Sequence, residues 1–187
     1  MLVNDDRPRH TMLRKIAQQA FTPKRVEHDV APWVARVVTE MIAELEDGEI
    51  DFMDRFAEIL PAKVMTRLIG TPYEDFDKLR RWASAFMVTS DFTMEERQQC
   101  NIELATYYTE AVNARYSDIE RGMAAPDDLM TAFIRAQDEG QSLTREEVIR
   151  FCLTLVVAGA ETTGYLLGNL VCTLAEEPGF FPRLKAD

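Results

Sequence analysis

The stretch AGAETT, residues 158–163, places an acid and two hydroxyl side chains inside a long apolar segment. An ionised carboxylate that is buried without partners is costly, so it shifts its pKa or lies beside a polar cavity. A buried acid with a perturbed pKa is a candidate for proton chemistry. We therefore take Glu161 and Thr162 as candidate catalytic residues.

Helical spacing places Thr154, Ala158, Glu161 and Thr162 on one face. The Thr162 hydroxyl can donate a hydrogen bond to the Ala158 carbonyl, which bends a helix locally and opens its backbone to water or ligand. Ala158 and Gly159 are small and leave room beside the backbone. The pattern predicts a groove that ends in an acid and an alcohol, an arrangement suited to delivering protons.

The same residues have a purely structural interpretation. Small side chains also occur where two helices cross, and a buried glutamate can be neutralised by an arginine from another element. The residues 158–163 taken alone leave both interpretations open.

The element that carries this stretch has a clear start signal. Thr144 and Glu147 have the spacing of a capping box, so a helix is expected from about residue 145 to Glu177-Pro178-Gly179. A helix of about 32 residues is roughly 48 Å long and would cross the whole domain. Because FCLTLVVAGA, residues 151–160, is apolar on all sides, we expect it to be buried all round.

Apolar residues recur at helical spacing in the other segments too, so the fold class is mainly α, with at most one short strand. The strand is expected at GEIDF, residues 48–52, where the pattern alternates. The other helices are expected at residues 9–20, 23–46 with a break near Pro32, 52–70, 73–88, 94–121 and 126–138.

Composition limits the classes of partner. The chain has 187 residues, enough for one sizeable core, and a net charge of −11, which argues against nucleic acid. The charge is uneven: residues 1–25 carry +4 and the remainder carries −15. The basic segment is either a solvated helix face or a docking site for an acidic partner.

Several features indicate a cytoplasmic protein that does not enter the membrane. The longest apolar run is shorter than a membrane span, and Met1 is not followed by a basic and then apolar leader. The three cysteines, Cys100, Cys152 and Cys172, lack the spacing of a disulfide framework or a zinc site. No metal site is predicted from the residues.

Three stretches together resemble the cytochrome P450 family, the haem-thiolate monooxygenases. AGAETT is similar to the family pattern A/G-G-x-D/E-T-T/S of the long oxygen-binding helix. DRPRHTMLR, residues 6–14, is similar to D-P-P-x-H-x-x-x-R, with Arg7 in place of the first proline. FAEILPAKVMTRLIGTP, residues 56–72, resembles a helix and turn of bacterial members, and the order of the three stretches agrees.

The resemblance implies roles for the cofactor and its oxygen. His10 and Arg14 would hold the propionates of haem b, and residues four apart on a helix do share one face. Ala158 and Gly159 would line the oxygen-binding groove. Glu161 and Thr162 would relay protons to bound dioxygen, a kind of assistance that is typically worth ~10²–10⁴ in rate.

The resemblance also implies substrate and partner contacts. A small organic substrate would face residues of the long helix, namely Thr154, Val157 and Ala158, and less directly Phe86, Met87 and Val88. The basic opening segment would dock an acidic ferredoxin-type electron donor.

The chain departs from the family where the iron is bound. The family holds iron through a cysteine in F-x-x-G-x-x-x-C-x-G downstream of the long helix, and none of the three cysteines fits that pattern. Glu147 and Arg150 have the letters of the family's E-x-x-R motif but precede AGAETT, and the capping box already accounts for Glu147.

Residues 1–187 are therefore interpreted as a partial cytochrome P450 domain, running from the propionate-binding helix to just past the oxygen-binding helix, without the haem-thiolate segment. The complete parent would hydroxylate a small organic substrate. This chain alone is expected to bind haem weakly or not at all and to be inactive. The alternative is a noncatalytic helical interaction module derived from the same fold.

Overall fold

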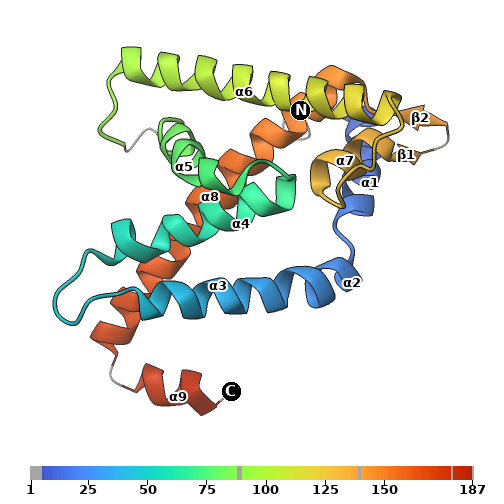
Figure 1. Cartoon of the computed structure of the whole chain (residues 1–187). Helices are drawn as coiled ribbons and strands as arrows, with labels where there is room; N and C mark the ends of the chain where they lie inside the picture. The colour runs from blue at the N-terminus through green and yellow to red at the C-terminus, as the bar shows by residue number, and fades with distance from the viewer. Residues whose placement is uncertain (1–5, 88–89, 139, 178, 187) are drawn as a thin grey trace.

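The computed structural model describes residues 6–87, 90–138, 140–177 and 179–186, and it is mainly helical. Figure 1 shows the helices crossing one another around the long helix α8, Arg145–Glu176. The other α-helices are α1 Arg9–Ala20, α2 Pro23–Arg25, α3 Ala31–Ala43, α4 Ile59–Ile69, α5 Phe76–Ser84, α6 Met94–Glu120, α7 Leu129–Arg135 and α9 Phe180–Ala186. Two π-helical segments, Val26–Val30 and Met53–Ala57, and a 3-10 turn, Tyr73–Asp75, complete the helical elements of the described residues.

The mainly α fold class is confirmed, but the position predicted for the strand is wrong. Residues 48–51 form a loop, and Asp51 accepts a hydrogen bond from the Asp54 amide at 3.0 Å, so it begins the next helical segment. An extended segment needs a partner strand for its backbone groups, and none lies beside this loop in the described part of the chain. Extended backbone occurs instead in a small hairpin, where β1, Gln137–Asp138, pairs antiparallel with β2, Gln141–Ser142.

Two of the long helices predicted from periodicity are divided in the structure. The predicted helix over residues 52–70 is a π-helical segment followed by α4, so Pro61 falls in the first turn of α4. Amides in a first turn have no partner within the helix, and a proline is tolerated there. The helix predicted over residues 23–46 divides in the same way, with Pro32 at the start of α3.

Two other helices are shorter than predicted. α7 begins at Leu129 and not at Pro126, because Asp128 caps it: Asp128 Oδ1 accepts from the Thr131 amide at 2.7 Å. α5 covers Phe76–Ser84 instead of residues 73–88, and Val88 lies outside the described residues.

The capping box predicted for α8 is confirmed. The Thr144 hydroxyl accepts from the Glu147 amide at 3.2 Å, and Glu147 Oε2 accepts from the Thr144 amide at 2.8 Å. An equivalent box, formed by Thr93 and Glu96, begins α6.

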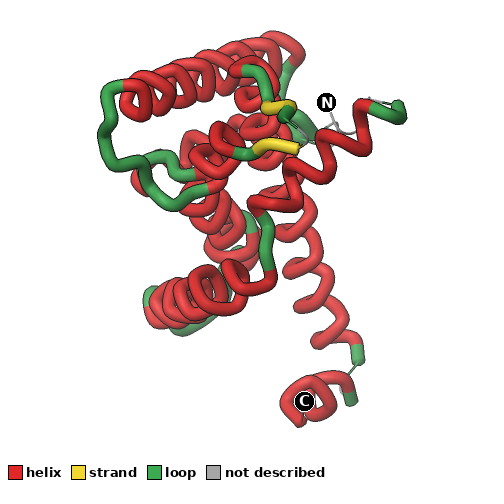
Figure 2. The backbone as a smooth tube through the Cα atoms, turned by 90° about the vertical axis from the view of Figure 1, so that its right-hand side faces the viewer, coloured by secondary structure: helices red, strands yellow, loops and turns green. Residues whose placement is uncertain are grey.

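The expectation that residues 151–160 are buried all round is wrong. One face of α8 enters the large core between α1, α4, α5, α6 and α7, and Ala158 on another face is exposed. The buried side chains of this face are Val148, Phe151, Cys152, Val156 and Ala160. Leu153, Leu155 and Val157 are only half-buried beside this core, and Figure 2 shows the last turns of α8 extending away from the other helices toward α9.

By length and composition α8 could cross a membrane, and 28% of its most apolar window is buried in the structure. A core helix of a soluble protein meets the same criteria, so this is weak evidence for a membrane span.

Candidate functional site

The hydroxyl groups of the AGAETT stretch bind to their own helix. Thr162 Oγ1 donates to the Ala158 carbonyl at 2.7 Å, as predicted, and Thr163 Oγ1 donates to the Gly159 carbonyl at 3.0 Å. Thr154 does the same with the Arg150 carbonyl at 2.7 Å. Each such bond competes with the backbone hydrogen bonds of the helix. Ala158 and Thr162 are both exposed residues of α8.

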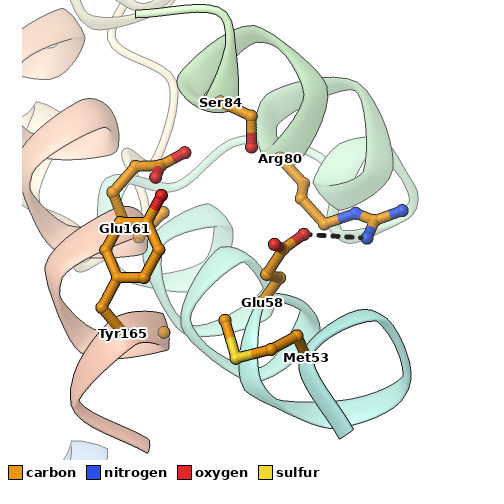
Figure 3. A pocket seen from close by; sticks show the side chains of 8 residues that line it. Met53, Glu58, Arg80, Ser84, Glu161 and Tyr165 are labelled. Carbon is orange, nitrogen blue, oxygen red and sulfur yellow. Dashed lines mark hydrogen bonds and ion pairs between the residues drawn. The ribbon is translucent and has the colours of Figure 1, made fainter. Parts of the chain in front are cut away.

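Glu161 is half-buried and lines a small pocket between α8, α5 and the start of α4. Figure 3 shows its carboxylate facing Ser84 of α5, with the Tyr165 ring beside it. The pocket measures about 10 Å³, enough for one water molecule. Its other lining residues are Met53, Glu58, Arg80, Ala160 and Gly164.

This environment favours the protonated form of Glu161. Burial raises the pKa of the carboxyl group, and the nearby negative charge of Glu58 raises it further. The Ser84 side chain, which faces the carboxylate, lowers the pKa and offsets part of this effect. Glu161 is thus an acid poised to hold a proton at higher pH than an exposed glutamate.

The small residues of α8 mark a helix crossing, one of the two interpretations left open by the sequence. A Cβ on Gly159 would lie 2.5 Å from Met65 Sδ of α4, and one on Gly164 would lie 3.1 Å from the Ala57 carbonyl oxygen. Gly159 therefore faces α4, whereas its neighbour Ala158 faces outward.

The other half of that interpretation, an arginine paired with Glu161, is not observed among the described residues. Arg80 is the arginine of the pocket, and it binds Asp54 at 3.0 Å and Glu58 at 3.3 Å. Figure 3 shows its guanidinium turned toward Glu58. Sequence reasoning did not identify Ser84, Glu58 or Arg80, because they lie 77 to 103 positions before Glu161 and carry no shared pattern.

α1 carries the two residues predicted to hold the propionates. His10 is half-buried and Arg14 is exposed, and within the described residues neither forms a side-chain hydrogen bond or ion pair. Their neighbour Arg9 instead bonds to Glu147, which ties α1 to the first turn of α8. This contact was not predicted, although the basic character of the segment indicated a role for its charges.

The E-x-x-R letters at Glu147 and Arg150 have the local explanation that was predicted. Glu147 belongs to the capping box, and Arg150 bonds to Glu146 one turn earlier.

The surroundings of the three cysteines do not favour metal binding. Cys100 and Cys152 are buried in the apolar core, and burial raises the pKa of Cys152 to about 12. Cys172 is exposed on α8. In the described ranges no group of three or more histidine, cysteine or acidic side chains is arranged to hold a metal ion.

Thr154 and Val157, predicted to face substrate, are both half-buried on α8, and Phe86 is 45% exposed just beyond the end of α5. The structure brings Ser84, two residues before Phe86, to the Glu161 pocket. The α1 residues His10 and Arg14 lie on a separate element near α7 and the hairpin.

Comparison with known proteins identifies a family for this chain. The cytochrome P450 family model matches residues 9–187. The chain is 34% identical to the cytochrome P450 monooxygenase PikC of Streptomyces venezuelae over 190 residues, covering 100% of this chain and 44% of PikC.

Solved structures agree. The LnmA cytochrome P450 hydroxylase of Streptomyces atroolivaceus superposes with a TM-score of 0.89 at 30% identity, covering 100% of this chain and 47% of that one. CYP109E1 of Bacillus megaterium, in complex with testosterone, gives a TM-score of 0.85 at 31% identity, covering 100% and 49%.

The chain thus spans about half the length of the relatives it matches. Since the family model and the fold agree over almost every residue, the chain belongs to the cytochrome P450 family.

Proposed function

We propose that this chain is part of a haem-thiolate monooxygenase that hydroxylates a small organic substrate, with Glu161 and Thr162 delivering protons. The proposal is carried by one observation: α8 places a half-buried acid of raised pKa next to a hydroxyl that is bonded to an exposed helix carbonyl. Relatives named as hydroxylases and monooxygenases support the reaction class.

The residues of this chain fit one part of a haem and not another. His10 and Arg14 lie four residues apart on α1 and have no side-chain partner among the described residues, which suits two carboxylate groups. The cysteines do not fit the iron: Cys100 and Cys152 are packed in the core, and Cys172 lies on an exposed face of α8, outside the sequence pattern of the family's iron ligand. We therefore assign the propionate contacts to α1 and derive no step at the metal.

Haem with a thiolate ligand, when bound, supplies the activation of dioxygen. The residues of this chain would handle the proton. Because burial raises the pKa of Glu161, this carboxyl group keeps its proton to higher pH than an exposed glutamate and can act as a proton donor. The Thr162 hydroxyl has one proton and two acceptor lone pairs, so it can accept a proton while passing its own onward.

The same proposal extends to the substrate and to the electron-donor protein. Thr154, Val157 and Ala158 would border the substrate on α8, with Phe86 and Met87 approaching from the end of α5. Ala158 and Gly159 would border the oxygen. The basic residues of α1 and the segment before it would dock an acidic ferredoxin-type donor, and the parent enzyme would act in the cytoplasm.

The proton role is tested by Thr162→Ala in a longer chain that supplies the thiolate ligand. We expect oxygen consumption to continue while product formation falls, measured as the ratio of product formed to oxygen consumed. Thr173→Ala is a matched control, because Thr173 donates to the Asn169 carbonyl of the same helix at 2.9 Å outside the AGAETT stretch. Unchanged coupling in Thr162→Ala would contradict the proton role.

The cofactor assignment is tested with the 187-residue chain. We expect weak or no haem binding on titration, and no thiolate-type Soret band after reduction and exposure to carbon monoxide. A thiolate-type band would show that one of the cysteines binds iron and would overturn the ligand argument.

A noncatalytic helical interaction module is the second candidate, favoured by exposed apolar side chains. Leu166 is 67% exposed on α8, and Phe181 is 57% exposed on α9. Light scattering and haem titration together separate the candidates. A defined complex of this chain, with no haem binding by this chain or by a longer one, would favour the module.

A further inference from the structure

Arg97 of α6 forms an unusual set of contacts with the segment that joins α5 to α6. Its guanidinium donates to the carbonyl oxygens of Ala85 at 3.1 Å, Ser90 at 2.8 Å and Phe92 at 3.1 Å. It also donates to the Met87 carbonyl. One side chain thus binds carbonyls that are spread over eight residues.

The position of Arg97 is unfavourable for its own helix. It lies in the first turns of α6, after the Thr93 cap, where the helix dipole disfavours a positive charge. The same charge is favourable for α5, because Ala85 is the C-cap of that helix and its carbonyl oxygen accepts from the guanidinium. Arg97 therefore acts across the connection, as a cap for the end of α5.

The described residues of this connection, 85–87 and 90–92, contain turns beside this guanidinium. The Phe86 amide donates to the Ala83 carbonyl at 3.0 Å, and the Met87 amide donates to the Ser84 carbonyl at 3.1 Å. The Ser90 amide and hydroxyl both donate to the Met87 carbonyl, at 3.2 and 2.8 Å. Carbonyls that accept from Arg97 are thus part of the turns that fix Phe86 and Met87.

Ser84 connects this cluster to the candidate site. It is the last residue of α5, directly before Ala85, and its side chain lines the Glu161 pocket (Figure 3). A shift at the end of α5 would move Ser84 relative to Glu161, whose carboxylate it faces.

We propose that Arg97 is a positioning residue: by binding the carbonyls of the α5–α6 connection it fixes Ser84 against Glu161 and fixes the Phe86–Met87 surface. The relevance to substrate and proton delivery rests on the proposed function. The positioning role of Arg97 does not rest on the proposed function, so an experiment can contradict one without contradicting the other.

Hydrogen exchange of the full 187-residue chain tests the positioning. Arg97→Gln removes the charge and the forked donor, and Arg97→Lys keeps the charge only. Hydrogen bonds to charged groups contribute ~1.5–3 kcal/mol, so the amides of Phe86, Met87 and Ser90 should exchange at least about tenfold faster in Arg97→Gln. Arg97→Lys should fall between Arg97→Gln and the wild type.

Arg121→Gln is the matched control. Arg121 follows the last residue of the same helix, and among the described residues its side chain donates only to the Ser117 carbonyl and Asp118 of the last turn. Exchange of residues 84–92 should be unchanged in this variant. Unchanged exchange in a folded Arg97→Gln, or loss of folding in both Arg97 variants, would overturn the proposal.

The pKa of Glu161, measured by NMR of its carboxyl group, is a second test, because a general loss of stability would not change it. The polar groups that line the pocket with Glu161 are Ser84, Tyr165 and the ion pair of Glu58 and Arg80. Because Ser84 lowers the pKa of Glu161, Ser84→Ala and Arg97→Gln should both raise it, and Arg121→Gln should not. A Glu161 titration that responds to Ser84→Ala but not to Arg97→Gln would overturn the link to the pocket.

Discussion

The two halves of α8 have similar apolar sequences and different surroundings. In the first half, one face is sealed by α5, α6 and α7, and Val148, Cys152 and Val156 are at most 1% exposed. In the second half, from Glu161 onward, the sole buried residue among those described is Gly164, which lies against Ala57 of the π-helical segment. Tyr165 and Leu166 are exposed there.

This difference shows that apolar composition specifies a helix but does not specify which of its faces other elements pack against. The candidate site lies at the boundary, where Glu161 faces packed helices and Thr162 faces open space. An acid at such a boundary has a raised pKa and still has access to a partner surface, which a fully buried acid would lack.

The largest effect is expected at the ion pair that anchors the sealed half. Asp128 and Arg115 have side chains only 5% and 12% exposed, and Arg115 also donates to the Gly70 carbonyl at 3.1 Å. Asp128→Ala leaves a buried charge without its partner and removes the cap of α7, so the free energy of unfolding should fall by about 4–5 kcal/mol. Urea denaturation measures this change.

Asp127→Ala is the control for that prediction, since the neighbouring carboxylate is 89% exposed. It should change the free energy of unfolding by about 0.5 kcal/mol or less. Equal effects of the two substitutions would show that the ion pair does not anchor this region.

A direct comparison of the two halves comes next. Phe151 is 8% exposed and packs against Phe133 with ring centroids 5.2 Å apart, whereas Leu166 is 67% exposed. Phe151→Ala should lower the free energy of unfolding by about 3–4 kcal/mol. Leu166→Ala should change it by at most about 0.5 kcal/mol, measured in the same denaturation series. A large effect at Leu166 would mean that the second half is covered in solution, for example by a second copy.

The start of α8 should contribute less. Thr144→Ala removes one side of the capping box, which should lower the free energy of unfolding by about 1 kcal/mol. Thr144→Ser keeps the acceptor and is expected to restore most of the loss. No difference between the two variants would show that the box does not stabilise α8.

The smallest expected effect is the contribution of Glu161 to the pH dependence of stability. The raised pKa of Glu161 means that the folded state holds this proton more tightly than the unfolded state. The free energy of unfolding is therefore lowered as pH rises from below the ordinary glutamate pKa of about 4.3 through the raised value. Glu161→Gln should remove this loss, so the variant should gain stability relative to the wild type at neutral pH and gain less in acid. Thermal unfolding at pH 4 and pH 7 measures it, and a gain that is equal at both pH values would contradict the assignment.

Local signals in the sequence determined much of the fold. The Thr144–Glu147 spacing predicted the start of α8, because a cap is formed by residues three positions apart, and the bond from Thr162 to Ala158 follows from a single helical turn. Three short motifs predicted the family, which the match over residues 9–187 confirmed.

Only the tertiary structure decided what surrounds those elements. It showed that α8 is covered on one face, that residues 48–51 lack a strand partner, and that Asp128, not Pro126, sets the start of α7 through its bonds to Thr131 and Arg115. It also brought Ser84, Glu58 and Arg80 to Glu161 and placed Arg97 at the end of α5. Helix periodicity and capping depend on neighbours within a turn, whereas burial, pKa and ion pairing depend on residues far away in the chain, whose proximity is set by packing.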